Sequence, residues 1–137
     1  MTLVMKFGGT SVGSAEAIQR TAELIKQYKD EYGRVVVIAS AMGSKPVKVT
    51  DLLLQGSNTA VTGDQDTYKT LLKQMRHIHF TAIDQLLNDE HEQSALKEEI
   101  DSFLERYGDL CGAISVLGEI SPRAADAIGG MGEQMSV

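Results

Sequence analysis

Two short apolar runs near the start of the chain, each followed by a loop of glycine and hydroxyl residues, constrain the fold most strongly. Residues 3–7 (Leu-Val-Met-Lys-Phe) form the first run, and residues 34–39 (Arg-Val-Val-Val-Ile-Ala) form the second. A continuous run of β-branched residues is typical of a strand covered on both faces, as in a parallel sheet. Because apolar residues between the runs recur at helical spacing, the pattern predicts a strand-helix-strand unit with a right-handed crossover.

The helix between these strands carries a signal at each end. Ser14 is a residue type that caps the first turn of a helix, and Gly33 is a residue type that follows the last turn. We therefore expect the helix to lie between these two residues.

Two longer apolar stripes predict a helical hairpin at about residues 68–112, with a polar turn at residues 88–93. Residues 84–105, which we call the acidic block, hold eight of the chain's 19 acidic residues and one base. This block therefore carries −7, and the rest of the chain carries +1. We interpret the acidic block as a solvated helix surface at the tip and outer face of the hairpin.

Shorter elements are predicted on either side of the hairpin. Residues 50–54 indicate a short capped helix, and residues 56–58 and 62–64 indicate turns. Ser121 and Pro122 open another helix, and the last five residues begin a further one. A parallel sheet of two strands is too small to cover this much helix, so we expect the N-terminal part of a longer domain.

Composition excludes several classes of protein. With 137 residues, 42% of them hydrophobic, the chain is about one globular domain long and is not a disordered chain. The single cysteine, Cys111, excludes an internal disulfide framework and is expected to be a small buried apolar residue. The three histidines lack metal-ligand spacing, so no metal site is expected. A net charge of −6 argues against nucleic acid as a partner.

We expect neither a membrane partner nor export. The apolar runs are too short to span a bilayer, and the first residues lack a basic region followed by a long apolar stretch. The expected location is therefore cytoplasmic.

The loop after the first strand, residues 8–11 (Gly-Gly-Thr-Ser), has the composition of an anion site. Glycines let the backbone approach a ligand closely, and a following helix start is partly positive. Lys6 precedes the loop and could meet a phosphate as a point charge. The spacing matches neither the P-loop nor Gly-x-Gly-x-x-Gly. From glycine spacing alone, a tight turn beside a surface lysine is an equal alternative.

A second small polar loop, residues 40–43 (Ser-Ala-Met-Gly), follows the second strand. Ligands of open parallel sheets bind outside the carboxyl ends of the strands. We therefore expect the two loops to face one crevice, with Ser40 as a candidate ligand contact.

Four segments, in this order and spacing along nearly the whole chain, resemble the aspartate kinases of the amino-acid kinase family. They are Lys6–Val12, Ser40–Gly43 with Val49–Asp51, Leu117–Arg123 and Gly132–Ser136. The resemblance implies an α/β fold, an αβα sandwich on a mainly parallel sheet, which this chain would contain only in part. It also implies transfer of the ATP γ-phosphoryl group, with Mg²⁺, to the β-carboxylate of L-aspartate. This reaction is the first step of lysine, threonine and methionine biosynthesis.

The resemblance also assigns roles to residues of this sequence. Ser40 and Thr50 would lie near aspartate or the transferred group, and Glu133 would pair with the aspartate amino group. Lys6 would be the catalytic lysine, and no residue is assigned to a metal. The residues expected to bind the ATP phosphates are Lys6, Phe7, Gly8, Gly9, Thr10 and Ser11. Glu119, in a similar Gly-Glu pair, receives no substrate role.

Under this interpretation, residues 1–137 form the N-terminal part of the catalytic domain. The C-terminal part of the kinase domain and the ACT regulatory domains lie outside the chain. We therefore expect the chain alone to be inactive, and the intact enzyme to be a homo-oligomer. An insertion at residues 45–48 separates Gly43 from Thr50 and leaves the role of Thr50 open.

Two alternatives stay open at this point. The first is another amino-acid kinase, or a nucleotide monophosphate kinase, with the same fold. The second is a non-catalytic interaction module that uses the acidic block as its docking surface.

Overall fold

The computed structural model describes residues 1–44 and 46–137 and begins with the predicted strand-helix-strand unit. Strand β1 (Thr2–Phe7) pairs in parallel with β2 (Arg34–Ala39), so that Phe7 lies beside Ala39 at the carboxyl end. Helix α1 (Ala15–Tyr32) connects them, after a 3-10 turn, η1 (Gly9–Val12). The predicted α/β fold with a parallel sheet is confirmed.

Both predicted ends of α1 are confirmed. The hydroxyl oxygen of Ser14 accepts a hydrogen bond from the Ala17 N–H at 3.2 Å. Gly33 has a φ of 74°, in the left-handed region that favours glycine, and its N–H donates to the Lys29 carbonyl at 2.8 Å. The sequence therefore fixes the length of α1 by local chemistry.

The sheet is covered on one face. Helix α1 packs on both strands, and Phe7, which points toward it, is 8% exposed. On the opposite face Val4 is 60% exposed, and Val36 and Ile38 are each 49% exposed. The prediction that the second strand is covered on both faces is therefore wrong for the described residues, because α1 covers only one side.

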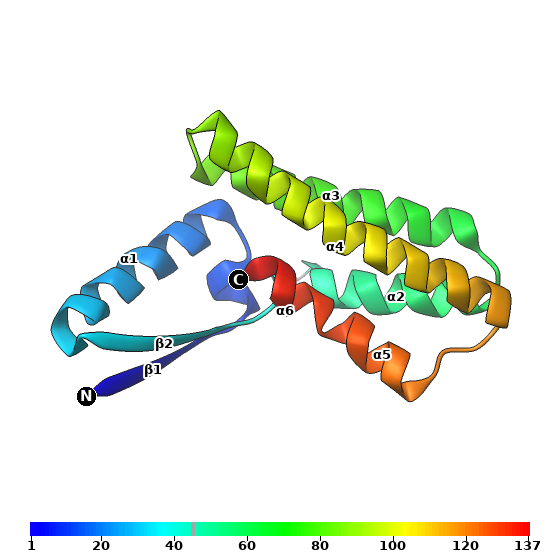
Figure 1. Cartoon of the computed structure of the whole chain (residues 1–137), viewed down its shortest axis with the longest axis horizontal. Helices are drawn as coiled ribbons and strands as arrows, with labels where there is room; N and C mark the ends of the chain where they lie inside the picture. Colours follow the sequence, from blue (N-terminus) through cyan, green and yellow to red (C-terminus); the bar gives the residue numbers. More distant parts are fainter. Residues whose placement is uncertain (45) are drawn as a thin grey trace.

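The rest of the chain forms a short hairpin and a group of packed helices beside the sheet (Figure 1). Helices α3 and α4 are the predicted hairpin, and each extends beyond the predicted range of 68–112. The elements are β3 (Gly43–Ser44), β4 (Val47–Lys48), α2 (Val49–Val61), α3 (Gln65–Leu86), α4 (Glu90–Leu117), α5 (Pro122–Gly129) and α6 (Met131–Ser136). Lys45, part of the predicted insertion, lies outside the described residues.

Helix α2 differs from the prediction in length and in its start. It continues through residues 56–58, where a turn was predicted, and ends before the correctly predicted turn at residues 62–64. Its first helical residue is Val49, and no side chain caps it, so Thr50 is not the cap. The helix persists through Gly56 because packing against α3 and α4, rather than local propensity, decides its length.

Tyr107 on α4 explains the glycine in the middle of α2. Its ring is fully buried, and its hydroxyl donates to the Leu53 carbonyl at 3.0 Å. Burial raises the pKa of the Tyr107 phenol, which therefore stays protonated and able to donate. A Cβ at Gly56 would overlap the Tyr107 oxygen, so only glycine leaves room for this bond.

The acidic block lies on the surface, as predicted. Seven of its eight acidic residues are exposed, and the partly buried one, Asp101, pairs with Arg76 of α3 through bonds of 2.6 and 2.8 Å. Hydrogen bonding to Arg76 lowers the pKa of the Asp101 carboxyl. Lys97 of the same block lies 2.5 Å from Asp84. These pairs link α3 to α4 on their solvent side.

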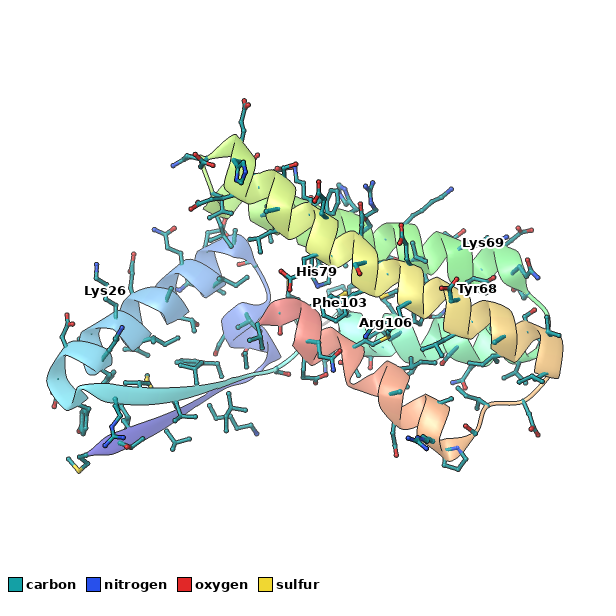
Figure 2. The ribbon with its side chains drawn as sticks, viewed as in Figure 1. Lys26, Tyr68, Lys69, His79, Phe103 and Arg106 are labelled. Atoms are coloured by element: carbon teal, nitrogen blue, oxygen red, sulfur yellow. The ribbon has the colours of Figure 1, made fainter. Side chains whose placement is uncertain are left out.

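His79 and Cys111 are buried among the helices. His79 lies on the inner side of the hairpin, whereas Lys69 of α3 and Lys26 of α1 point outward (Figure 2). The His79 Nδ1–H donates to the Met75 carbonyl at 2.8 Å, and burial lowers the pKa of the imidazole, so it is neutral at pH 7. The buried, apolar role predicted for Cys111 is confirmed.

Within the part of the chain that the structure describes, no three His, Cys, Asp or Glu side chains are grouped closely enough to hold a metal ion. None of the described helices combines the length and apolar character needed to cross a bilayer.

Two glycine substitutions test the packing of Tyr107. We expect Gly56→Ala to lower the free energy of unfolding by about 1–3 kcal/mol, because the new methyl displaces a fully buried side chain. Gly112→Ala in α4 meets no atom within 4 Å and should raise the free energy of unfolding by roughly 0.5–1 kcal/mol. Urea denaturation measures both. Equal effects of the two variants would refute this account.

Candidate active site

The loops that follow β1 and β2 meet at the carboxyl end of the sheet. The Ser40 N–H donates to the Phe7 carbonyl at 3.0 Å and so extends the parallel pairing by one residue. Beyond this point the loop backbones touch, since a Cβ at Gly9 would lie 2.5 Å from the Gly43 carbonyl oxygen. Gly9 is therefore required by the close approach of the second loop. The predicted meeting of the two loops is confirmed.

A cleft of about 670 Å³ opens between these loops and the start of α2. The Val49 N–H donates to the Met42 carbonyl at 3.0 Å, which holds the first turn of α2 against the second loop. The lining residues are Gly9, Thr10, Ser40, Ala41, Met42, Gly43, Lys48, Thr50 and Asp51. Hydroxyls, backbone groups, one cation and one carboxylate thus share a single cavity.

The side chains that line this cleft carry one charge of each sign, on Lys48 and on Asp51. Helix α2 begins at its wall without a side-chain cap, so its first turn offers backbone N–H groups and the positive end of the helix dipole. Lys48, the residue just before the helix, adds a full positive charge. The acidic block contributes none of the lining residues.

Helix α6 packs against the same loops (Figure 1). A Cβ at Gly132 would lie 2.7 Å from the Ala41 Cβ and 3.6 Å from the Thr50 Oγ1, so α6 closely approaches two lining residues. The Ser136 hydroxyl donates to the Ser40 carbonyl at 2.5 Å. Residues 96 positions apart in the sequence are thereby joined directly.

Glu133 on α6 carries an unusual carboxylate. Its Oε2 atom is buried and has no hydrogen-bond partner among the described residues. Buried carboxylate oxygens are normally paired, because desolvation without a partner is costly. A ligand that donates hydrogen bonds, an ammonium group above all, would satisfy this atom.

The structure distributes the predicted site residues over four places. Gly9, Thr10, Ser40 and Thr50 line the cleft, and Gly8 adjoins it in sequence. Phe7, Thr10 and Ser11 line a smaller hollow of about 270 Å³ beside α1. Lys6 is exposed on the sheet face opposite α1, and Glu133 lies on α6 next to Gly132.

Sequence reasoning missed Lys48 and Asp51 as lining residues. Both flank Thr50 at the start of α2. The sequence feature that could have revealed them is a pair of charged residues at the start of the helix that follows the second loop. This feature was missed because the helix was predicted to begin at Thr50, one residue after its observed start at Val49.

Comparison with known proteins identifies the family. The model of the amino acid kinase family matches residues 1–137, the whole chain. The chain belongs to the amino acid kinase family. Membership agrees with the parallel pairing of β1 and β2 and with the position of the cleft at their carboxyl ends.

Several relatives within the amino acid kinase family are aspartokinases. The chain is 33% identical to the aspartokinase of Candida albicans over 136 residues, 98% of this chain and 24% of that protein. It is 35% identical to the chloroplastic aspartokinase 2 of Arabidopsis thaliana over 138 residues, 99% of this chain and 23% of that protein. The chain thus spans about a quarter of the length of the curated relatives it matches.

A solved aspartokinase structure is similar to this chain over nearly its whole length. The crystal structure of E. coli aspartokinase III in complex with aspartate and ADP (R-state) superposes with a TM-score of 0.78 at 27% identity. The match covers 99% of this chain and 27% of that chain.

Adjacent glycines allow a matched test of the loop contact. We expect Gly9→Ala to lower the free energy of unfolding by about 1–3 kcal/mol, because its Cβ would collide with the backbone of the second loop. Gly8→Ala meets open space and should change the free energy of unfolding by less than about 0.5 kcal/mol. Thermal or urea denaturation distinguishes the two. A harmless Gly9→Ala would show that the loops do not touch.

Proposed function

We propose that residues 1–137 are the N-terminal part of the catalytic domain of an ATP-dependent aspartate kinase. The observation that carries the proposal is the cleft where the Gly8–Ser11 loop, Ser40 and Thr50 meet, in a chain that superposes on an aspartokinase bound to aspartate and ADP. The names of the Candida and Arabidopsis relatives support the same activity.

The proposed reaction suits a site without a general base. The β-carboxylate of aspartate is ionised at neutral pH because its pKa lies near 4. One of its oxygens attacks the γ-phosphorus of ATP, the bond from that phosphorus to the bridging oxygen breaks, and ADP leaves with the bonding electrons. What the protein must supply is alignment of two anions and neutralisation of the charge between them.

Two sources of positive charge are proposed for the phosphates. Lys6 and the backbone N–H groups of the Gly8–Ser11 loop take the role that the family resemblance gives them. Lys48 and the uncapped start of α2 add to them, since both lie in the cleft wall.

Glu133 is proposed to hold the amino acid. Its unpartnered Oε2 would accept a hydrogen bond from the aspartate ammonium group, which removes the cost of burying that oxygen alone. Ser40 and Thr50, on the other side of the Gly132 contact, would donate hydroxyl hydrogens to the substrate carboxylates or the transferred group.

No described residue of this chain is proposed to bind Mg²⁺ directly. The cleft contains one carboxylate, Asp51, and no group of three metal-ligating side chains occurs among the described residues. In the proposal the ion accompanies the ATP phosphates, whose oxygens and water are its preferred ligands. We further propose that the intact enzyme is cytoplasmic and homo-oligomeric.

Matched glutamate substitutions test the proposed function. In the full-length protein, ADP release should depend on L-aspartate, and Glu133→Gln should lower kcat/KM for aspartate by at least about thirtyfold, because the variant loses a buried charge pair. Glu119→Gln is the control, since Glu119 is exposed and follows a glycine in the same way. A coupled ADP-release assay measures both variants.

The same assay separates the alternatives. If turnover is faster with another amino acid or with a nucleoside monophosphate than with L-aspartate, that acceptor, and not aspartate, is the substrate. An absence of turnover with every acceptor would favour the non-catalytic module. Residues 1–137 alone should give no turnover, and a rate close to that of the full-length protein would refute the proposed division of the domain.

A further inference from the structure

The backbone of Ser40 makes two hydrogen bonds that join three separate segments. Its N–H donates to the Phe7 carbonyl at the end of β1, at 3.0 Å. Its carbonyl accepts from the Ser136 hydroxyl at the end of α6, at 2.5 Å. One peptide segment therefore connects the start of the glycine loop, the second loop and the helix that carries Glu133.

The Ser136 hydroxyl lies within hydrogen-bond distance of two carbonyls, that of Ser40 and that of Glu133 in its own helix. Its oxygen also lies 3.1 Å from the Glu133 carbonyl, but a hydroxyl has one hydrogen, and the Ser40 carbonyl is the closer acceptor. Both residues are partly buried, which limits competition by water.

Packing holds the other side of α6. Met131 and Met135 are buried in the core formed with α2, α3 and α4, and Gly132 is buried against Ala41. Glu133 thus lies between two anchored positions, Gly132 before it and Ser136 after it. Among the described residues of α6, Ser136 is the one whose side chain hydrogen-bonds to the second loop, so its hydroxyl adds a directional contact to the apolar packing.

We propose that Ser136 is a positioning residue of the active site. Its hydroxyl fixes the Glu133 carboxylate relative to Ser40 and Thr50, so that the distance from this carboxylate to the Ser40 and Thr50 hydroxyls stays constant. Ser136 acts through these residues and does not itself contact substrate. The inference rests on the proposed function for the identity of the substrate, but the contact between α6 and the loop can be tested without it.

The kinetic test uses the full-length protein. Ser136→Ala should raise KM for L-aspartate about threefold to tenfold, the equivalent of one lost hydrogen bond, with KM for ATP changed less than about twofold. Ser136→Thr keeps the hydroxyl and should restore KM for aspartate. Ser57→Ala is the control, because its hydroxyl donates to the Leu54 carbonyl within α2. It should leave both KM values unchanged.

A structural readout separates this inference from the proposed function. Amide hydrogen exchange in residues 40–43 and 131–136 should be faster in Ser136→Ala than in the wild type, and unchanged in Ser57→Ala. Faster exchange together with a selective rise in KM for aspartate supports the inference. Unchanged exchange, or an equal rise in both KM values, overturns it. A wild type without aspartate-dependent turnover overturns the proposed function, and with it the role of Ser136 in positioning Glu133 for aspartate, whatever the exchange rates.

Discussion

The hydrogen bonds at Ser40 are the interaction on which the rest of the site depends. The N–H of this residue extends the pairing of β1 and β2, and its carbonyl receives the hydroxyl of Ser136. Because β1 leads directly into the glycine loop, the Ser40 backbone connects that loop to α6 through these two hydrogen bonds. The cleft between the loops and α2 is held by these bonds together with the bond from the Val49 N–H to the Met42 carbonyl and the close approach of Gly9 to Gly43.

Apolar packing among the helices of the bundle holds α6 in place beside the loops. Helix α6 contributes Met131 and Met135 to a core that also contains residues of α2, α3, α4 and α5 and, from the second loop, Ala41 and Met42. The burial of apolar surface therefore holds α6 against this loop. The acidic block lies on the solvent side of the same bundle and none of its residues lines the cleft. The acidic surface of the bundle is thus separate from the cleft, whose lining side chains carry one charge of each sign.

Local sequence signals predicted most of the fold. Ser14, Gly33 and Ser121 act within one helical turn, and for that reason the ends they mark are confirmed. The continuation of α2 through Gly56 was not predictable, because the reason is Tyr107, on another helix. For the site, glycine loops at two strand ends predicted a shared crevice. The contact between Ser136 and Ser40 spans 96 positions and leaves no local trace in the sequence.

The most direct test of the account is a crystal structure of the full-length protein with ADP and L-aspartate. We expect the aspartate ammonium nitrogen to lie about 2.7–3.2 Å from Glu133 Oε2, a normal hydrogen-bond distance. The β-carboxylate should face the Gly8–Ser11 loop, and the bond from Ser136 to Ser40 should be intact. Aspartate bound away from Glu133, with this carboxylate paired to another part of the protein, would show that Glu133 does not hold the amino acid.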